Sequence, residues 1–362
     1  MKICFLAAAN SIHSYRWVKY FAEGKHQVFW ISLAPLTVGP EIQNVNFYEI
    51  RKSIINPFSF LKTLSQIKKI IKKVNPDLLH AHYAGTYGLL GALTNFHPFV
   101  VTAWGSDVFL TKGFKKMLVK FVLRKADLLT CDGENTTKAM ISLGAKPEKI
   151  KRICFGTDVE KFSAKSGSAE VFGEGRKPNS KIKIISLRSL EPLYDIETLI
   201  QAAKMVLKEF SETQFIIAGD GGQKEHLMNL TKLLNIEKNI KFIGQVQNDL
   251  LPQFLQSADI YVSTSLSDSG LAASTAEAMA SGLPVIVTDS GDNKKWIEEN
   301  KNGFVVPLKN PSKLAEKTIY LLKNKNLRES FGKYNRKIIE ERNNYYKEME
   351  KMEKIYKKII IK

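Results

Sequence analysis

The feature that most constrains this chain is an alternation of short apolar runs with segments of helical period. Such runs are typical of buried parallel strands, and the segments between them are long enough for crossover helices. The runs are 3–9, 27–33, 77–82, 99–103, 128–131, 182–187, 215–218, 240–243, 260–263 and 284–288. The pattern predicts an α/β fold in which helices cover both faces of parallel sheets.

The chain has 362 residues, which is enough for two domains of ordinary size. The stretch 163–180 is rich in Ser, Gly and charge and lacks periodicity, so we expect a linker there. This divides the chain into an N-terminal Rossmann-like domain at 1–162 and a second at 181–326. The charged remainder, 327–362, is expected to be helical and to pack back toward the N-terminal domain.

Cysteine usage and the N-terminus favour a reducing, cytoplasmic setting. Cys4, Cys131 and Cys154 are far apart in the sequence, which argues against a disulfide framework or a cysteine zinc site. The apolar run 3–9 is followed closely by Arg16 and Lys19 and is interpreted as a first strand, not a signal peptide.

Two phosphate-binding motifs can be judged from glycine placement. The turn after the first apolar run contains no glycine, which argues against a dinucleotide fingerprint there, and no Walker loop occurs. In the second half, Gly219, Asp220, Gly221 and Gly222 follow an apolar run, but Lys224 stands where a third dinucleotide glycine is expected. A diphosphate site and a tight turn without a ligand both remain open.

The segment 265–293 contains a motif that resembles that of one particular protein family. Its stretch EAMASGLPVI resembles the core motif of the family-4 glycosyltransferases, which are retaining enzymes of the GT-B fold that use nucleotide-activated sugars. Other blocks resemble that family in the same order and cover nearly the whole chain, among them HSYRWVKYFAEGKHQV, VVTAWGSD, SLRSLEPLYDIETLI and AGDGG.

The resemblance implies a transferase with two Rossmann-like domains facing a central cleft, of which 1–162 would be the acceptor-side domain and 181–326 the nucleotide-sugar-binding domain. Its co-substrate would be a nucleoside diphosphate sugar such as a UDP-sugar, and no metal or other cofactor is expected. The acceptor would be a glycan or a lipid-linked sugar in cell-surface polysaccharide or glycoconjugate synthesis. Glu277 would hold the donor ribose through its hydroxyls, and the turn from Gly219 to Gly222 would lie near the diphosphate.

Three positions depart from the family pattern around the donor. Ser269 stands where a first acidic residue is usual, so Asp268, or the backbone of Ser269, Gly270 and Leu271, would contact the donor sugar. Of the usual Arg and Lys clamp, Arg188 lies one position early, and Tyr194 takes the place of the lysine. Arg188 is expected to bind the diphosphate, since charge-assisted contacts stabilise a leaving phosphate.

Of the three candidate catalytic residues, Asp268 is the one near the donor, and the other two lie in the N-terminal half. Trp104 replaces a histidine found in many relatives, so that contact cannot be transferred to this chain. Asp107 and His13 are the candidates for contacting acceptor or donor sugar, although His13 can equally cap or pack. His80 and His82 would share one face of a strand; lacking a third ligand, they are expected to pack and to make one hydrogen bond toward the cleft.

Positive charge is concentrated in residues 51–125, which hold 13 Lys and Arg against 2 Asp and Glu, within a net charge of +18. The strongest cluster is Lys115, Lys116, Lys120, Arg124 and Lys125. Either these side chains are a solvated face above apolar stripes that pack on the sheet, or they contact an anionic membrane as in a peripheral protein of the inner face. Nucleic acid is not an expected partner, because its recognition patterns are absent.

Two other functions remain compatible with the fold. The departures at Ser269, Tyr194 and Trp104 would also suit a non-catalytic protein that binds a glycan or a partner. A nucleotide-sugar epimerase of the same architecture is the second alternative, since fold alone does not determine function.

Overall fold

The computed structural model describes residues 1–50, 57–163 and 181–361, and it divides into two compact units. Unit 1 is Met1–Phe155 with Lys347–Lys362, and unit 2 is Gly156–Tyr346. The boundary therefore falls seven residues before the expected position, and most of the expected linker lies outside the described residues. The expected α/β class is confirmed, with one parallel sheet in each unit.

Unit 1 is built on a seven-stranded parallel sheet in the order β3-β2-β1-β4-β5-β6-β7. Its strands are β1 (Lys2–Leu6), β2 (Gln27–Ser32), β3 (Val45–Glu49), β4 (Leu78–His82), β5 (Phe99–Thr102), β6 (Leu128–Cys131) and β7 (Ile150–Arg152). The strand order reverses between β1 and β4, which pair in parallel register. In open α/β sheets, ligands bind beyond the carboxyl ends of the strands at such a switch point.

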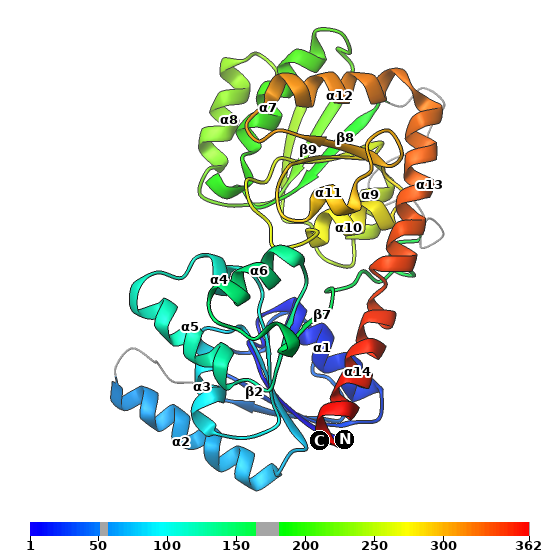
Figure 1. Ribbon diagram of the computed structural model, residues 1–362. Helices are drawn as coiled ribbons and strands as arrows, with labels where there is room; N and C mark the ends of the chain where they lie inside the picture. The colour runs from blue at the N-terminus through cyan, green and yellow to red at the C-terminus, as the bar shows by residue number, and fades with distance from the viewer. Residues whose placement is uncertain (51–56, 164–180, 362) are drawn as a thin grey trace. The chain divides into compact units, whose positions relative to one another are not determined.

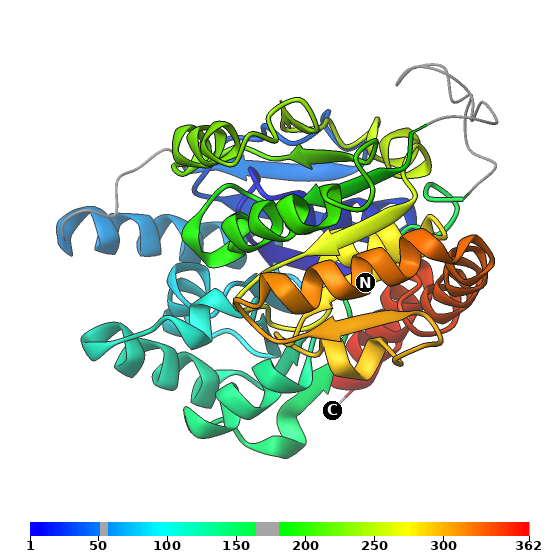
Figure 2. The same ribbon diagram turned by 90° about the horizontal axis from the view of Figure 1, so that it is seen from above.

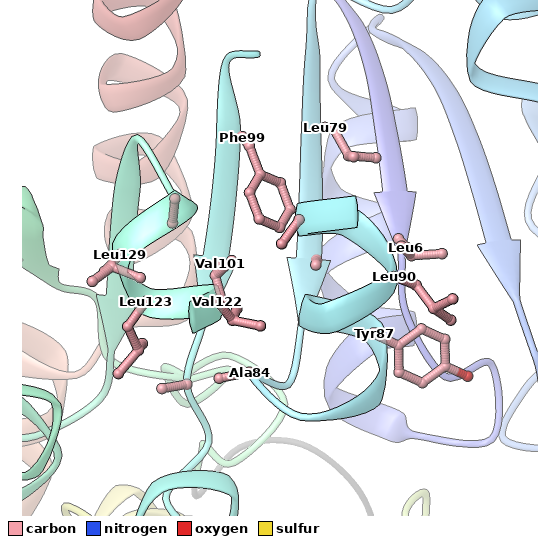
Figure 3. Close-up of a cluster of buried hydrophobic side chains, with 14 of the residues drawn as sticks. Leu6, Leu79, Ala84, Tyr87, Leu90, Phe99, Val101, Val122, Leu123 and Leu129 are labelled. Carbon is pink, nitrogen blue, oxygen red and sulfur yellow. The ribbon is translucent and has the colours of Figure 1, made fainter. Parts of the chain in front are cut away.

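Side chains alternate between the two faces of the unit 1 sheet. Cys4 and Leu6 of β1 point into the larger hydrophobic core together with Leu79 and Ala81 of β4. Helices α2, α3 and α5 cover that face, and Figure 3 shows Tyr87 and Leu90 of α3 and Val122 and Leu123 of α5 directed into this core. The helices of unit 1 are α1 (Ile12–Glu23), α2 (Pro57–Val74), α3 (Thr86–Thr94), α4 (Ser106–Phe109), α5 (Gly113–Lys125), α6 (Glu134–Ser142) and most of α14 (Tyr345–Ile360).

Helix α14 packs on the opposite face of the unit 1 sheet. Its Tyr356 ring lies 5.0 Å from that of Phe21 of α1, and its hydroxyl hydrogen-bonds Nδ1 of His80. The Glu348 carboxylate accepts a hydrogen bond of 2.8 Å from the Cys154 amide. The part of the expected helical segment that returns to the N-terminal sheet thus begins near residue 347, about twenty residues later than expected.

Unit 2 contains a six-stranded parallel sheet in the order β10-β9-β8-β11-β12-β13. Its strands are β8 (Lys183–Leu187), β9 (Gln214–Ala218), β10 (Ile240–Gly244), β11 (Ile260–Ser263), β12 (Val285–Thr288) and β13 (Gly303–Val306). Here the order reverses between β8 and β11. Strands β3, β7 and β13, absent from the list of apolar runs, are all edge strands.

The helices of unit 2 are α7 (Ile196–Leu207), α8 (Lys224–Leu233), α9 (Leu251–Gln256), α10 (Ala273–Ala280), α11 (Asn293–Trp296), α12 (Pro311–Lys323) and α13 (Lys325–Arg342). Helices α7 and α12 run side by side over one face of the sheet (Figures 1 and 2). Helix α12 begins with Pro311 at its first position, and the Asn310 side chain accepts from the Lys313 amide, which satisfies a free N–H of the first turn.

Helix α13 belongs to unit 2 because it packs closely on the end of α10. A Cβ on Gly332 would lie 1.9 Å from the Gly282 carbonyl oxygen, so a glycine is needed there. Nearby, the Asn335 amide donates to the carbonyl oxygens of Leu283 and Asn302 at 2.7 and 2.8 Å. Helix packing therefore requires the glycine at 332, whereas Gly282, which ends EAMASG, has a φ of +76° and only an ordinary 3.8 Å contact at its Cβ position.

Candidate active site

Arg188 follows β8 at the switch point and contacts several polar side chains of unit 2. Its Nη2 donates to Asp268 Oδ1 at 2.6 Å and to Ser265 Oγ at 3.1 Å, both in the segment after β11. Its guanidinium carbon lies 4.4 Å from the centre of the Tyr194 ring. The structure thus brings together three residues predicted for the donor site, namely Arg188, Tyr194 and Asp268.

The ion pair of Arg188 and Asp268 is largely buried, with side-chain exposures of 9% and 13%. Burial lowers the pKa of the guanidinium, but the Asp268 carboxylate and the Tyr261 and Tyr194 hydroxyls oppose this and leave the net pKa raised. The Arg188 Nε atom is buried without a hydrogen-bond partner. Tyr194 contributes its ring face to this arrangement.

The glycine turn after β9 packs against the residues that follow β8. A Cβ on Gly219 would lie 2.1 Å from the Arg188 carbonyl oxygen, and one on Gly221 would lie 2.6 Å from that of Leu190. The Gly221 amide donates to Asp220 Oδ1 and the Gly222 amide to Glu191 Oε1, at 2.9 and 2.8 Å. The glycines are therefore needed for close packing, and two amides expected near a diphosphate are satisfied by carboxylates.

A pocket of about 270 Å³ opens at the carboxyl edge of the unit 2 sheet. It is lined by Leu187, Arg188, Ser189, Ala218, Gly219, Asp220, Gln245, Val246, Leu251, Ser274 and Glu277. Glu277 lies half-buried on α10, whose N-cap residue Ala272 has no side chain to accept from the first-turn amides. The pocket combines a cation, the N-terminus of a helix without a side-chain cap, and a carboxylate, a set suited to a nucleotide with a phosphate group.

Not every residue predicted for the donor site lines this pocket. Of the predicted residues, Arg188, Gly219, Asp220 and Glu277 do so, whereas Ser269, Gly270 and Leu271 belong to the loop before α10. That loop is packed closely, since a Cβ on Gly291 would lie 2.6 Å from the Gly270 carbonyl oxygen. Leu271 is 7% exposed.

In unit 1, aromatic rings gather at the carboxyl edge of the sheet. His13, at the start of α1, stacks on Phe155 with ring centres 4.6 Å apart and meets Trp104 edge-on at 5.2 Å. The Trp104 ring lies 5.7 Å from that of His82, the last residue of β4. His13 therefore has mainly aromatic neighbours, and burial and the nearby Arg16 lower its pKa to about 4.

Asp107 occupies a different position from the one expected of a residue that contacts a sugar. Its side chain is 1% exposed, and its carboxylate accepts from the amides of Ala84, Trp104 and Gly105 at 2.6, 2.9 and 3.0 Å. These bonds tie the loop after β4 to the loop after β5. The geometry favours a positioning role for Asp107, because no oxygen of the carboxylate faces solvent.

His80 and His82 lie on the same face of β4, with ring centres 4.6 Å apart. His80 Nε2 is 2.7 Å from Thr102 Oγ1, whereas both ring nitrogens of His82 are buried without a partner. His80 thus hydrogen-bonds Thr102 and Tyr356, and both bonds lie in the protein core, in contrast to the single bond toward the cleft that was expected. Among the described residues, no group of three or more His, Cys, Asp or Glu is arranged to hold a metal ion.

Comparison with known proteins identifies the family. Residues 168–338 match the family model described as glycosyl transferases group 1, and residues 2–133 match the model described as glycosyl transferase 4-like. The chain belongs to the family-4 glycosyltransferases of the GT-B fold. The two matches include the glycine turn and the EAMASG segment, and together they cover most of both units.

The glycosyltransferase is similar over almost its full length to proteins of known activity. It is 24% identical to N-acetyl-alpha-D-glucosaminyl L-malate synthase of Bacillus anthracis, covering 93% of this chain and 91% of that protein. It is 27% identical to N,N'-diacetylbacillosaminyl-diphospho-undecaprenol alpha-1,3-N-acetylgalactosaminyltransferase of Campylobacter jejuni, covering 92% of each. Anabaena HepE in complex with UDP-glucose superposes with a TM-score of 0.82 at 16% identity, over 99% of this chain and 100% of that chain.

In the basic region of the glycosyltransferase, one expectation was that the apolar stripes pack on the sheet, and part of the stripe of α5 does not. Val122 is buried in unit 1, but Phe114 and Met117, which lie on the same apolar stripe of the helix, are 69% and 64% exposed. Leu110, just before α5, is 71% exposed, and Lys115, Lys116, Arg124 and Lys125 are exposed around this end and along the helix, with Lys120 half-buried. The start of α5 therefore presents apolar and basic side chains together, because the buried residues of the helix are Val119, Val122 and Leu123, in its second half.

A similar arrangement occurs at the start of α2, where Phe58 and Leu61 are 84% and 60% exposed. Helix α3 contacts both α2 and α5 and lies between them. We call Phe58, Leu61, Leu110, Phe114 and Met117 the apolar tip. In the described part of the chain, no helix combines the length and apolar character needed to cross a bilayer.

Sequence reasoning missed several residues of these sites. Ser265 and Ser274 contact Arg188, and the Tyr261 hydroxyl donates to Ser274 Oγ at 2.8 Å. Phe155 completes the aromatic cluster of unit 1. Placement after β11 and at the start of α10 is the signal that could have identified the serines, since both lie at the switch point.

Proposed function

We propose that the enzyme is a retaining, metal-independent hexosyltransferase that moves a sugar from a nucleoside diphosphate sugar to a lipid-linked or glycan acceptor. Its role would lie in cell-surface polysaccharide or glycoconjugate synthesis, in the cytoplasm and peripherally at the inner face of the membrane. The observation that carries the proposal is the pocket of unit 2, which combines Arg188, the N-terminus of α10 and Glu277.

The donor is proposed from the chemistry of this pocket. Arg188 and the first-turn amides of α10 supply positive charge and N–H donors for a diphosphate. The Glu277 carboxylate can accept hydrogen bonds from two ribose hydroxyls. A UDP-sugar is the first candidate, because the structurally similar HepE was crystallised with UDP-glucose.

The proposed reaction relies on positioning and on stabilisation of the leaving group. Attack by the acceptor hydroxyl on the same face from which the diphosphate departs preserves the anomeric configuration. The departing phosphate oxygen takes the proton of the acceptor hydroxyl, so no separate general base is required. Arg188 would stabilise the charge that develops on the diphosphate, as fixed donors do for other developing anions.

The acceptor and the membrane location are proposed from two different observations. The Campylobacter relative is named for an acceptor linked through a diphosphate to undecaprenol. In this chain, the apolar tip lies beside exposed lysines of α5, a combination that suits the interface of an anionic membrane.

The proposal is tested with a panel of nucleotide sugars, by thermal stabilisation first and then by transfer. A bound donor should raise the melting temperature, because it binds the folded state. Transfer to a synthetic prenyl-diphosphate sugar should proceed in EDTA, and NMR of the product should show the anomeric configuration of the donor. Inversion, loss of activity in EDTA, or epimerised nucleotide sugar formed without acceptor would each contradict it.

A further inference from the structure

The aromatic cluster of unit 1 lies where its topology places a ligand site. His13 follows β1, His82 ends β4, and the sheet order reverses between these two strands. Trp104 comes two residues after β5, and Phe155 three residues after β7. Four segments at the carboxyl edge of one sheet thus bring their rings together.

The three outer rings form a connected surface. His13 and Phe155 are nearly parallel, with an interplanar angle of 23°, and Trp104 stands almost perpendicular to His13 at 86°. Trp104 and Phe155 are 5.8 Å apart, and all three side chains remain partly exposed. We call His13, Trp104 and Phe155 the ring platform.

Polar atoms without partners border the ring platform. The Nε1 atom of Trp104 and both ring nitrogens of His82 are buried and make no hydrogen bond. Leaving a buried polar atom unsatisfied costs about 1–3 kcal/mol, so each such atom in a native protein calls for an explanation. A ligand with hydroxyl groups can donate to an imidazole nitrogen and accept from an indole N–H.

The ring platform offers little charge at neutral pH. Burial and then Arg16 lower the pKa of His13 to about 4, and burial and then His13 lower that of His82 to about 3. The nearby Asp107 carboxylate is occupied by backbone amides. Arg16, one turn along α1 from His13, is the cation that acts on the platform residues.

This chemistry separates two classes of acceptor that occur among relatives. The Bacillus relative is named for L-malate, a small dicarboxylic acid, whose recognition calls for paired cations. A pyranose instead has a flat face of polarised C–H bonds, which is attracted to the negative face of an aromatic ring, and hydroxyls at its rim. Neutral rings with unpaired polar atoms at their border suit the pyranose.

The geometry points to the ring platform as an acceptor subsite that stacks His13, Trp104 and Phe155 against a pyranose, so that the acceptor group is a sugar and not a small carboxylic acid. This inference rests on the proposed transferase activity. It adds the substrate class on the unit 1 side, whereas the donor chemistry is assigned to unit 2.

Tryptophan fluorescence provides a direct binding test. Trp17, Trp30 and Trp296 are 2%, 1% and 8% exposed, so the half-exposed Trp104 is the indole that an added ligand can reach. Octyl pyranosides of glucose, galactose, N-acetylglucosamine and N-acetylgalactosamine, kept below their micelle concentrations, are the probes. At least one should change the emission saturably, and octanol and L-malate should not. A response to L-malate alone, or to no pyranoside, would overturn the inference.

Kinetics then separate the platform from the donor site. Trp104→Ala and Phe155→Ala should each raise KM for the sugar acceptor about 10-fold or more, while Trp104→Phe, which keeps a ring, should recover most of the affinity. The rise in melting temperature that UDP causes should stay within about twofold of the parent's in these variants, because the donor pocket lies in unit 2. Phe47→Ala is the matched control. Phe47 lies on the edge strand β3, and the substitution removes its aromatic contact to Trp30 of β2.

The outcomes distinguish the two proposals. Unchanged acceptor KM in both Ala variants, with normal donor binding and turnover, would overturn the acceptor subsite and leave the transferase proposal intact. Absence of nucleotide-sugar binding in the parent protein would instead contradict the proposed function itself.

Discussion

Arg188 and Asp268 form a buried ion pair, with 2.6 Å between Nη2 and Oδ1, although they are 80 residues apart in the sequence. The pair joins the segment after β8 to the segment after β11, and the Tyr194 ring covers the guanidinium. Asp268 therefore holds in place the cation that is proposed to meet the diphosphate. A donor phosphate would share Arg188 with a carboxylate, which limits how far the guanidinium can move.

Replacing Arg188 with Ala should lower kcat/KM for transfer by about 10²- to 10³-fold, the usual cost of removing a donor that stabilises developing charge. Binding of the nucleoside alone should change much less, because the guanidinium acts on the diphosphate. Titration calorimetry with uridine and with UDP, beside steady-state kinetics, separates the two effects. Equal losses for uridine and UDP would place Arg188 away from the phosphates.

Replacing Asp268 with Ala should destabilise the protein by about 3–5 kcal/mol, because it leaves the Arg188 charge buried and unpaired. The double variant Arg188→Ala with Asp268→Ala should recover part of this loss, and urea unfolding of the four proteins gives the coupling energy. Additive losses would show that the pair does not act as a unit.

Glu277→Ala should nearly abolish transfer and weaken donor binding by about 10-fold or more, since two hydrogen bonds to a carboxylate are lost. Thermal shift with the donor measures the binding change. Glu237→Ala is the control, because Glu237 is exposed and lines no part of the pocket. Parent-like affinity and turnover in Glu277→Ala would contradict the assignment of the donor site.

Gly219→Ala should impair both folding and donor binding, because its Cβ would lie 2.1 Å from the Arg188 carbonyl oxygen and displace that segment. Gly244→Ala serves as a control: its φ of +72° makes a side chain costly by about 1 kcal/mol, but no atom lies within 4 Å of its Cβ. Urea unfolding and UDP affinity should both show the larger effect at Gly219. The same effect for the two variants would mean that backbone strain alone accounts for it.

Membrane binding should have a salt-sensitive part and an apolar part. Changing Lys115, Lys116, Lys120, Arg124 and Lys125 to Gln should remove most binding to anionic vesicles at 0.1 M salt, where charges act over about 10 Å. Changing Leu110, Phe114 and Met117 to Ser should remove the binding that persists at 1 M salt. Vesicle sedimentation measures both, with circular dichroism to verify the fold. Parent-like sedimentation of both variants would show that this face does not meet a membrane.

His82 should make the protein sensitive to acid. Burial lowers its pKa from 6.5 to about 3, so below pH 6.5 the unfolded chain binds a proton that the folded chain excludes. Stability is therefore lost as the pH falls from 6.5 toward 3, by about 2 kcal/mol at pH 5. In urea unfolding, the free energy of unfolding of His82→Phe should fall between pH 7.5 and 5 by about 2 kcal/mol less than that of the parent. Identical pH dependence would contradict the assigned shift.

Much of the fold followed from the sequence because central parallel strands are buried on both faces and appear as continuous apolar runs. Edge strands were harder to predict. In β3 (Val45–Glu49), polar and apolar residues are mixed and no residue is buried, and β7 (Ile150–Arg152) has three residues, of which two are exposed. Such segments are strands because a neighbouring strand offers hydrogen bonds, which no local pattern records.

The candidate site likewise combines features that the sequence predicts with features that only the tertiary structure shows. The sequence by itself determined the glycine turn, the helix that carries Glu277, and the presence of Arg188 after an apolar run, since these depend on local chain geometry and on residue types that suit phosphate and ribose. Only the tertiary structure decided that Asp268 pairs with Arg188, that Asp107 is enclosed by backbone amides, and that Phe114 and Met117 remain exposed. These outcomes depend on which loops meet at a sheet edge and on which residues of a helix the rest of the unit covers, and chain segments distant in sequence set both.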